Sequence, residues 1–330
     1  MKATIVFDGS VLGALPPTGV AISFVTTLRA YCAISSARLV LVAPPGAWLE
    51  GLPEIEVVTA DVRRSRRHFL LPRLLKSLAA TLLHSPVAAL PLRTPCPCIA
   101  TIHDLPWRAR VPLAENGVSL RHRLALHLAL ARARIVLVPS LATAADLDNL
   151  PKLRVVPHGI TTPQTAAAAS ALRGPFLAIG DDRPRKNLDR LRAAHTMARE
   201  MDQELPDLRV IGPLGGYVDE TEKVRLLRTC RALVHVALHE GFGLPVLEAM
   251  AHGVPVLASS QRALVELAGE AALVVDPLDT AAIAAGLVLV HRDEALRLRL
   301  ASAGRQRASA FTPARSAELW SLAHAEAMAP

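Results

Sequence analysis

Two glutamates, Glu240 and Glu248, flank a glycine-proline turn in the stretch HEGFGLPVLEAMAHGVPVLAS. Ionised carboxylates only accept hydrogen bonds, so a pair of them suits the hydroxyl groups of sugars. Pro245 fits the first turn of a helix, where its missing N–H costs nothing, and Gly243 permits a tight backbone entry before it. The pattern predicts a strand, a glycine loop, a short helix and a following strand.

The loop from Gly241 to Leu244 is predicted to bind an anion. Its backbone N–H groups precede a helix N-terminus, which carries about half a positive charge. A diphosphate held there would bring a ribose and a hexose within reach of different acids, so the pattern fits a nucleotide sugar. Without a ligand, the same two acids would be a solvated loop residue and a helix-stabilising residue.

Basic residues are the second chemical signal. The net charge is +8, and 32 of the 37 Lys and Arg residues are Arg, which binds phosphates bidentately. Arg185 and Lys186, in AIGDDRPRKNLDRL, stand at a predicted helix start, where a cation is slightly unfavourable unless an anion binds nearby. A nucleic-acid binder would explain the charge but not the acids, and the 3% aromatic content argues against stacking on single strands.

Short apolar runs alternate with helical patterns along the chain. Eleven runs predict strands, over 3–7, 37–43, 55–59, 98–102, 134–140, 154–158, 175–180, 207–212, 231–238, 254–259 and 271–276. Helices are predicted over 18–33, 118–132, 141–149, 187–201, 219–230, 245–252 and 279–292, and a further helix starts at Thr312-Pro313. Such alternation indicates parallel sheets with right-handed crossovers.

A length of 330 residues predicts two domains, because one hydrophobic core rarely serves so long a chain. The fold class is α/β, with two doubly wound, Rossmann-like domains that face a central cleft and bind ligands beyond the carboxyl ends of their strands. We predict an N-terminal, acceptor-side domain over 1–160, a Thr- and Ala-rich linker over 161–174, a C-terminal domain over 175–310, and a helix over 311–330. That last helix is expected to pack back on the N-terminal domain.

Two polar sites follow strands at their carboxyl ends. His103, after the strand over 98–102, is either half of a buried pair with Asp104 or a residue of the ligand cleft. Ser140 is either the N-cap of the helix over 141–149 or a contact to the acceptor.

The run RRSRRHFLLPRLLKSLAATLL (63–83) is basic and then apolar with helical spacing. It is either a solvated face followed by a packed helix or a surface that docks on anionic lipid. No apolar stretch reaches the roughly 18 residues of a membrane-spanning helix, and the N-terminus lacks a signal-peptide pattern. The four cysteines have no metal-binding spacing, which indicates reduced thiols. We expect a cytoplasmic protein, either free or peripheral at the inner face of the membrane.

The stretch EGFGLPVLEAMAHGVPVLAS resembles the signature of retaining GT-B glycosyltransferases of family four, also called group one, with its E-x7-E motif. Other pieces resemble the family in the same order, namely HDL (103–105), VLVPS (136–140), VVPHGI (155–160), AIGDDRPRKNLDRL (178–191), ELAGEAALVVDP (266–277) and FTPARSAELW (311–320). The resemblance covers nearly the whole chain and implies a GT-B fold and a nucleotide-sugar donor.

By this resemblance the C-terminal domain binds the donor. Glu248 would hold the ribose hydroxyls, and Glu240 would contact the donor hexose. The backbone of Phe242, Gly243 and Leu244 would lie near the hexose and the diphosphate.

The resemblance also gives roles to basic residues and to the N-terminal domain. Lys186, aided by Arg185, would neutralise the diphosphate leaving group. His103 would face the donor hexose, and Gly19, in PPTGVAISFVTTLRA, would lie in a loop that approaches donor and acceptor. The family needs no bound metal, and Asp181-Asp182 is adjacent rather than spaced as Asp-x-Asp, so no metal or other cofactor is expected.

The activity implied is that of a retaining hexosyltransferase of cell-surface polysaccharide assembly. It would move a hexose from a GDP- or UDP-sugar to a glycan or lipid-linked acceptor hydroxyl, and HDL and PRKN resemble mannosyltransferase-like members, which favours GDP-mannose. Three departures keep alternatives open, because Asp181 replaces an Arg, Val236-Ala237 replaces Pro-Ser, and the segment 209–219 is short. The alternatives are a catalytically weak or inactive donor-binding subunit and a sugar-nucleotide epimerase of the same fold.

Overall fold

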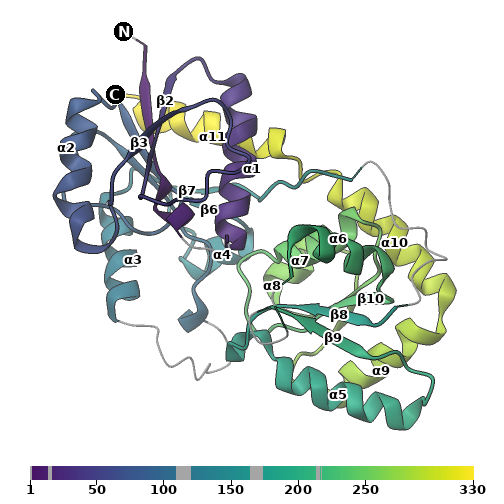
Figure 1. Cartoon of the computed structure of the whole chain (residues 1–330). Helices are drawn as coiled ribbons and strands as arrows, with labels where there is room; N and C mark the ends of the chain where they lie inside the picture. The colour runs from purple at the N-terminus through teal and green to yellow at the C-terminus, as the bar shows by residue number, and fades with distance from the viewer. Residues whose placement is uncertain (1, 14–16, 109–119, 164–173, 213–215, 217) are drawn as a thin grey trace. The chain divides into compact units, whose positions relative to one another are not determined.

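The computed structural model of the 330-residue chain describes every residue except 1, 14–16, 109–119, 164–173, 213–215 and 217 (Figure 1). The described residues form two compact units. Unit 1 comprises residues 2–104, 120–161 and 312–330, and unit 2 comprises residues 105–108 and 162–311, with the gaps just given. Most of the predicted linker over 161–174 lies outside the described residues.

Unit 1 is built on a parallel seven-stranded sheet in the order β3-β2-β1-β4-β5-β6-β7. Its strands are β1 (Thr4–Asp8), β2 (Arg38–Ala43), β3 (Glu56–Thr59), β4 (Leu82–Ser85), β5 (Cys98–Thr101), β6 (Ile135–Val138) and β7 (Leu153–Val155). Val6 of β1 pairs with Val40 on one side and with Leu83 on the other. The central strands β1, β4 and β6 are buried along their whole length, as expected for parallel strands covered on both faces.

Three of the helices of unit 1 begin at side-chain caps. The helices of this unit are α1 (Gly19–Ile34), α2 (Leu70–Ser77), α3 (Leu120–Arg132), α4 (Leu141–Asp146) and α11 (Pro313–Met328), with 3-10 turns η1 (Gly9–Gly13) and η2 (Arg64–His68). Thr18, Ser140 and Thr312 accept a backbone N–H at the starts of α1, α4 and α11. Ser140 is therefore an N-cap, one of its two predicted roles. No helix within the described ranges is long and apolar enough to span a bilayer.

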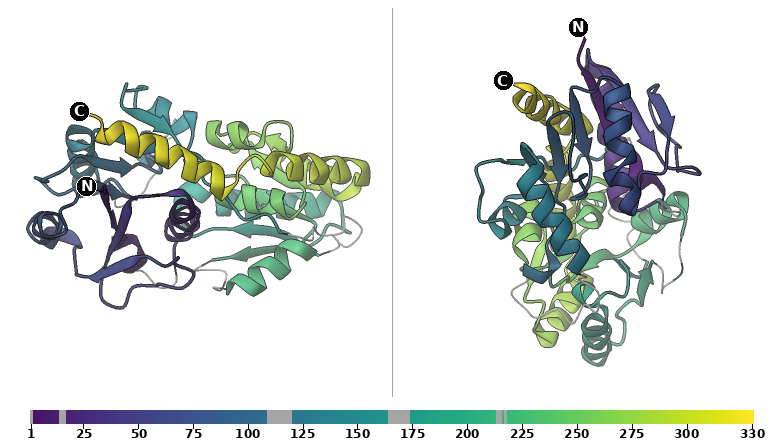
Figure 2. Two further views of the ribbon diagram at one scale, coloured as in Figure 1. Left: turned by 90° about the horizontal axis from the view of Figure 1, so that it is seen from above. Right: turned by 90° about the vertical axis from the view of Figure 1, so that its left-hand side faces the viewer.

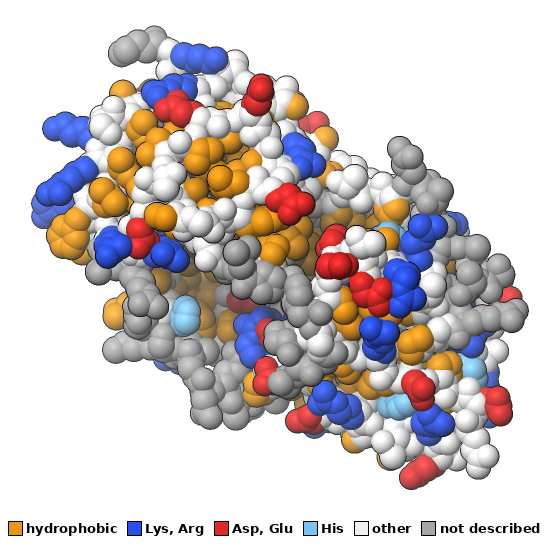
Figure 3. Space-filling view, viewed as in Figure 1, with side chains coloured by type: hydrophobic (Ala, Val, Ile, Leu, Met, Phe, Trp, Pro, Cys, Tyr) orange, Lys and Arg blue, Asp and Glu red, His pale blue; other side chains and the backbone are white. Residues whose placement is uncertain are grey.

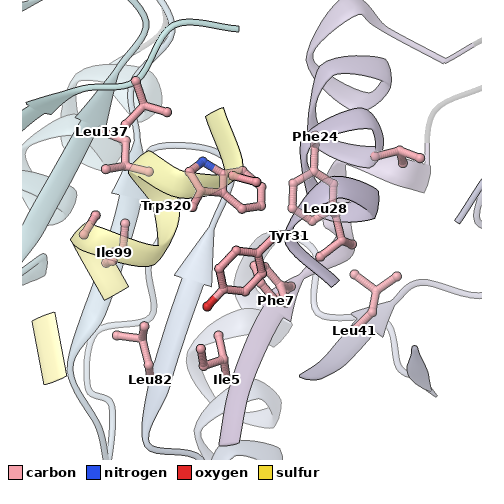
Figure 4. Packing of buried hydrophobic residues seen from close by; sticks show 14 of the residues in the cluster. Ile5, Phe7, Phe24, Leu28, Tyr31, Leu41, Leu82, Ile99, Leu137 and Trp320 are labelled. Atoms are coloured by element: carbon pink, nitrogen blue, oxygen red, sulfur yellow. The ribbon is translucent and has the colours of Figure 1, made fainter. Parts of the chain in front are cut away.

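The last helix completes the core of unit 1 (Figures 2 and 4). Trp320 of α11 stacks on Phe7 of β1, with ring centroids 5.9 Å apart. His324 lies 2.8 Å from the Tyr31 hydroxyl through Nδ1 and 2.9 Å from His84 Nδ1 through Nε2. All five side chains are buried, so the C-terminal helix belongs to the fold of unit 1.

Unit 2 is built on a parallel five-stranded sheet in the order β12-β11-β10-β8-β9. Its strands are β8 (Phe176–Ile179), β9 (Leu208–Ile211), β10 (Ala232–His235), β11 (Val256–Ser259) and β12 (Leu273–Val275). Its helices are η5 (Pro184–Lys186), α5 (Leu188–Met201), α6 (Glu220–Thr229), α7 (Leu244–Ala251), α8 (Arg262–Ala268), α9 (Thr280–Arg292) and α10 (Glu294–Ala308), while η3 covers Pro106–Arg108. Helix α10 packs closely on α7 at Gly304, where a Cβ would lie 3.2 Å from Met250 Cγ.

The predicted fold class is confirmed, since both units are doubly wound α/β sheets with parallel strands. All eleven predicted strands form, but β4, α8 and α10 were not predicted. The helical pattern over 63–83 was wrong at its end, because α2 stops at Ser77 and Ala79 takes a left-handed φ of 50°. Leu82–Ser85 then enter the sheet between β1 and β5.

Candidate functional site

The glycine loop and α7 fold as the sequence predicts. Gly243 has a left-handed φ of 105°, and a Cβ there would lie 2.5 Å from Leu264 Cδ2. Pro245 occupies the first turn of α7, and Gly253 follows the helix with φ of 70°. The N-cap of α7 is Gly243, which has no side chain to cap the first turn, so the helix starts without a cap from that residue.

Glu240, directly before the loop, carries a buried carboxylate that three side chains approach. Its Oε1 lies 2.5 Å from the Lys186 ammonium and 3.2 Å from His235 Nε2. The Arg185 guanidinium lies 3.8 Å from Oε2. The backbone oxygen of Glu240 accepts a hydrogen bond of 3.0 Å from Gln261 Nε2. Both the main chain and the side chain of this acid are therefore fixed.

Glu240 stays ionised in spite of its burial. Burial acts to raise the pKa of its carboxyl, but the charge of Lys186, together with His235 and Arg185, outweighs burial and holds that pKa well below its usual range. Burial lowers the pKa of His235, so its ring is neutral at pH 7 and Nε2–H donates to the carboxylate. Two cations and one anion therefore share this buried site.

The two cations stand on a short turn between β8 and α5. The turn η5 ends at Asn187, which has a left-handed φ of 60°. The Asn187 side-chain amide donates to the backbone oxygens of Val236, just after β10, and Pro277. The turn that carries Arg185 and Lys186 is thereby tied to the segment that leads into Glu240.

Glu248 lies one turn into α7 and is partly buried. Its Oε1 is 3.0 Å from the Lys223 ammonium of α6, which is also 3.0 Å from Glu220. Burial raises the pKa of the Glu248 carboxyl, and the charge of Lys223 offsets only part of that rise. Oε2 of Glu248 has no hydrogen-bond partner in the described parts of the chain.

His103 and Gly19 lie in unit 1, near the carboxyl ends of its strands. Gly19 is the first residue of α1, directly after the cap Thr18. His103 Nε2–H donates to the Pro86 carbonyl at 2.7 Å, because a carbonyl can only accept. Its Nδ1 is consequently an unprotonated acceptor, buried and without a hydrogen bond to any described residue. Burial lowers the pKa of His103, which keeps the ring neutral.

A cavity of about 20 Å³ lies beside His103, enough for one water molecule. Its wall includes His158, whose ring stacks on His103 with centroids 5.3 Å apart and an angle of 19° between the planes. The Ser23 hydroxyl of α1 lies 2.7 Å from His158 Nδ1. Burial, followed by the proximity of His103, lowers the pKa of His158 to about 3. Two neutral imidazoles therefore line the cavity.

Unit 2 holds seven of the predicted site residues, which are Arg185, Lys186, Glu240, Phe242, Gly243, Leu244 and Glu248. Arg185 and Lys186 meet Glu240, whereas Glu248 meets Lys223 instead. Sequence reasoning missed His235, Lys223 and Gln261. His235 stands in a predicted strand five residues before Glu240, and nothing in that spacing marks it as a partner.

The departures from the family pattern have structural counterparts. Asp181, which stands where the family has Arg, accepts from Arg183 at 2.5 Å. In the described part of 212–219, no strand or helix separates β9 from α6. Gly212 makes this short path possible, because a Cβ there would lie 2.1 Å from the Gly180 carbonyl oxygen. The short segment thus leaves β9 at the edge of the sheet.

A family model described as "Glycosyl transferases group 1" matches residues 213–307, which contain the glycine loop and both acids. Over these residues the chain is similar to the group 1 glycosyltransferases.

Two curated mannosyltransferases are similar to this chain. "O-antigen chain mannosyltransferase B" of Escherichia coli is 39% identical over 97 residues, which are 29% of this chain and 26% of that protein. "MMP alpha-(1->4)-mannosyltransferase" of Mycolicibacterium hassiacum is 34% identical over an alignment of 205 residues that covers 52% of this chain and 49% of that protein. The matches therefore span about half or less of the length of these relatives.

Solved structures match the fold of this chain over almost its whole length. Sucrose-phosphate synthase from Thermosynechococcus elongatus has a TM-score of 0.80 at 18% identity and covers 98% of this chain and 99% of its own. WaaG, a glycosyltransferase involved in lipopolysaccharide biosynthesis, has a TM-score of 0.72 at 17% identity, with 98% of each chain covered. Anabaena Alr3699/HepE, solved with UDP and glucose, has a TM-score of 0.72 at 16% identity and covers 98% of this chain and 100% of its own. The fold of the chain is GT-B.

Proposed function

We propose that the chain is a retaining glycosyltransferase, which moves a hexose from a nucleotide diphosphate sugar to an acceptor hydroxyl. The buried Glu240 cluster carries this proposal, because Lys186 and Arg185 lie beside the loop from Gly241 to Leu244. Since His235 is neutral, two cations against one carboxylate leave a net positive charge there, which suits a diphosphate.

In the proposed complex, the diphosphate lies on the loop and the N-terminus of α7. Glu248 accepts hydrogen bonds from the ribose hydroxyls through its open Oε2, and Glu240 accepts from the hexose. For His103 and Gly19 we propose the roles that the family resemblance implies. The unprotonated Nδ1 of His103 supports its role, because such an atom can accept a hydrogen bond from a sugar hydroxyl.

Transfer breaks the bond between C1 of the hexose and the β-phosphate oxygen and forms a bond from C1 to the acceptor oxygen on the same face. The electron pair of the broken bond stays on the diphosphate, whose growing charge Lys186 and Arg185 stabilise. The acceptor proton passes to the departing diphosphate within the ion pair, so no enzymic nucleophile takes part. Because these side chains supply the cations, we propose that transfer persists in the presence of EDTA.

We propose mannose as the hexose and GDP-mannose as the donor. Two relatives are named as mannosyltransferases, and one name specifies an alpha-(1->4) linkage, which supports retention if the donor linkage is also alpha. The name of the other relative refers to an O-antigen chain, which supports a glycan or lipid-linked acceptor in polysaccharide assembly. We place this reaction in the cytoplasm or at the inner face of the membrane.

A thermal-shift panel of UDP, GDP, ADP and their sugars tests donor binding, and nucleotide release with an added acceptor tests transfer. GDP-mannose is expected to stabilise the wild type. Glu240→Gln, which keeps the shape but removes the charge, should lower kcat about 100-fold or more. Glu318→Gln on α11 is the matched control, because Glu318 is exposed and pairs only with Arg315 among the described residues. Absence of a shift with every nucleotide would contradict the donor site.

The same assays separate the alternatives. A donor-binding subunit would be stabilised by the nucleotide sugar without transferring or hydrolysing it. An epimerase would change the sugar without releasing the nucleotide. The anomeric configuration of the product, measured by NMR, tests retention directly.

We also propose that unit 1 docks on anionic lipid through one face of α2. Phe69, Arg73 and Lys76 stand at i, i+4 and i+7, so they share a face, and all three are exposed. Leu71 and Leu75 face the core and are fully buried. Phe69 is 70% exposed, so most of its apolar ring faces solvent. Figure 3 shows Lys, Arg and hydrophobic side chains together over α2, at the left edge of the view.

A second exposed apolar residue extends this face. The Leu92 N–H donates to His68 Nδ1 at 3.2 Å, and the Leu92 side chain is 57% exposed. Residues 62–103 contain no Asp or Glu and seven Lys or Arg. Apolar side chains among cations suit an anionic bilayer. The arginines of the basic run contribute less, because Arg63 and Arg66 both pair with Asp61.

Co-sedimentation with phosphatidylglycerol and phosphatidylcholine vesicles tests the lipid surface. A Phe69→Ser, Arg73→Glu, Lys76→Glu variant should lose about tenfold or more of its binding to the anionic vesicles, since each cation near the surface is worth about 1 kcal/mol. Leu322→Ser combined with Arg315→Glu, on exposed positions of α11, is the matched control. Undiminished binding of the first variant would remove the lipid surface from the proposal.

A further inference from the structure

Lys223 of α6 is a largely buried cation between two acids. Its Nζ lies 3.0 Å from Oε1 of Glu248 and 3.0 Å from Oε2 of Glu220. The Lys223 side chain is 16% exposed and that of Glu248 is 24% exposed, whereas that of Glu220 is 67% exposed. An exposed ion pair contributes little, so Glu248 is the partner that matters for Lys223.

The contact occupies one oxygen of the Glu248 carboxylate and leaves the other open. Oε2 bonds to no residue that the structure describes, while Oε1 accepts from Lys223. A carboxylate oxygen has two lone pairs, so Oε2 can accept from neighbouring hydroxyl groups. The bond at Oε1 limits rotation of the carboxylate and thereby sets the direction of Oε2.

The charges around Glu248 come from α6 and from its own helix. Burial raises the pKa of the Glu248 carboxyl, Lys223 opposes that rise, and Glu220 adds to it. The pKa of Lys223 is raised, because its two acids outweigh the effect of burial. His252, after the end of α7, is a further titratable group near Lys223. Burial, followed by Arg228 and Lys223, lowers the pKa of His252, so its ring is neutral at pH 7.

We propose that Lys223 is a positioning residue for the donor, which keeps the Glu248 carboxylate ionised and directs its Oε2 at the ribose hydroxyls. The proposal rests on the proposed function, because it takes Glu248 as the group that binds ribose. Lys223 is therefore expected to strengthen the binding only of ligands that carry the ribose hydroxyl groups.

Calorimetric titration with GDP and with 2′,3′-dideoxy-GDP tests this specificity, with the UDP pair used if the nucleotide panel selects uracil. Lys223→Met should raise the Kd of the ribonucleotide about tenfold, as expected for a lost charge-assisted hydrogen bond. The Kd of the dideoxynucleotide should change by less than about twofold. An equal loss for both ligands would overturn the proposal, because Lys223 would then act on the diphosphate or on the fold.

Two matched variants control for charge and for folding. Lys223→Arg keeps a cation and should restore most of the affinity for the ribonucleotide. Glu220→Gln removes only the exposed partner of Lys223 and should change either Kd by less than about twofold. Failure of Lys223→Arg to bind better than Lys223→Met would count against a role for the charge.

A titration of the Glu248 side-chain carboxyl by carbon NMR needs no ligand. In Lys223→Met its midpoint should move to higher pH, because nothing then offsets the effect of burial. The affinity for the ribonucleotide should consequently fall at a higher pH than in the wild type as the solution is acidified. An unmoved midpoint would overturn the inference. A moved midpoint in a protein that binds no nucleotide would overturn the proposed function, and the ribose role of Lys223 with it.

Discussion

The Glu240 carboxylate is a charge that unit 2 can bury only because cations stand beside it. An isolated buried ion costs several kcal/mol, and a well-packed apolar residue would often be at least as stable at such a position. The fold nevertheless keeps Glu240 together with Lys186 and Arg185. Groups whose pKa is strongly perturbed by burial and by charged partners are common at functional sites, and this cluster has both features.

Replacing Lys186 by Gln should weaken both stability and transfer. Glu240 would lose its nearest cation, and breaking a buried pair costs about 3–5 kcal/mol of the free energy of unfolding. The value of kcat/KM with GDP-mannose should fall about 100-fold, because a cation beside the leaving diphosphate is lost. Lys186→Arg should recover more stability than rate, since the guanidinium cannot reproduce the position of a compact ammonium.

Lys2→Gln is the control for this variant, because Lys2 is exposed ahead of β1 in unit 1 and lies in no proposed site. Denaturant unfolding and initial rates measure the two effects separately. A folded Lys186→Gln protein with the wild-type rate would contradict the proposed role of the ammonium.

The sequence identifies the residues that stand in motifs, and it misses those that packing brings to them. Glu240, Glu248 and the PRKN cations have fixed spacing relative to glycine and proline, so their types and order suggest a ligand. His235 and Lys223 stand in an ordinary strand and an ordinary helix. Their contacts depend on how β10 and α6 pack beside the loop and α7, which no local spacing specifies.

The same contrast holds for whole elements. Strands with several consecutive β-branched or apolar residues were predicted, because such runs indicate buried parallel strands. The four residues of β4 follow an amphipathic helix directly, so the helical pattern was extended across them. Only the left-handed turn at Ala79 separates the two elements, and alanine gives no sign of such a turn.

Gly243→Ala should displace the start of α7. The left-handed φ of 105° is strained for alanine, and the new Cβ would lie 2.5 Å from Leu264 Cδ2 in the buried face of α8. Backbone strain and overpacking together should cost about 3 kcal/mol of the free energy of unfolding. The affinity for a nucleotide diphosphate should fall as well, because the loop amides move with the helix start.

Gly46→Ala is the matched control for Gly243→Ala. Gly46 also has a positive φ, of 69°, but a Cβ there would meet no atom within 4 Å. Its cost should be about 1 kcal/mol, from backbone strain alone, with no effect on nucleotide affinity. Equal costs for the two variants, measured by denaturant unfolding, would show that contact with Leu264 is unimportant.

At the scale of the whole molecule, each of the two described units has its own hydrophobic core. One gathers Phe7, Phe24 and Trp320 in unit 1, and the other gathers Phe176, Leu191 and Leu287 in unit 2. The core of unit 1 is closed by α11, which follows unit 2 in the sequence, so this unit cannot be completed before unit 2 has been synthesised. Two cores of this kind permit two unfolding transitions rather than one.

Unit 1 should be sensitive to acid, because it buries the neutral pair His84 and His324. Burial lowers the pKa of His324 to about 3, and burial together with the nearby His324 lowers the pKa of His84 well below its usual range. Unfolded histidine titrates near pH 6.5, so between that pH and the folded pKa the unfolded state binds more protons. The stability contributed by each neutral ring is therefore complete above about pH 6.5 and declines as the pH falls, by about 1.4 kcal/mol per pH unit.

His324→Gln tests this dependence, since glutamine can donate and accept hydrogen bonds to Tyr31 and His84 without titrating. The variant should be less stable than the wild type at pH 7.5, because its amide cannot reproduce both hydrogen bonds of the ring. Between pH 6 and 4, however, the free energy of unfolding of unit 1 should depend less on pH in the variant, with a slope smaller by about 1.4 kcal/mol per pH unit. His127→Gln, on an exposed position of α3, should leave that slope unchanged. Denaturant unfolding followed by Trp320 fluorescence measures the slope. Parallel pH profiles for His324→Gln and the wild type would show that His324 is already protonated in the fold, and the neutral Tyr31–His324–His84 chain would then be wrong.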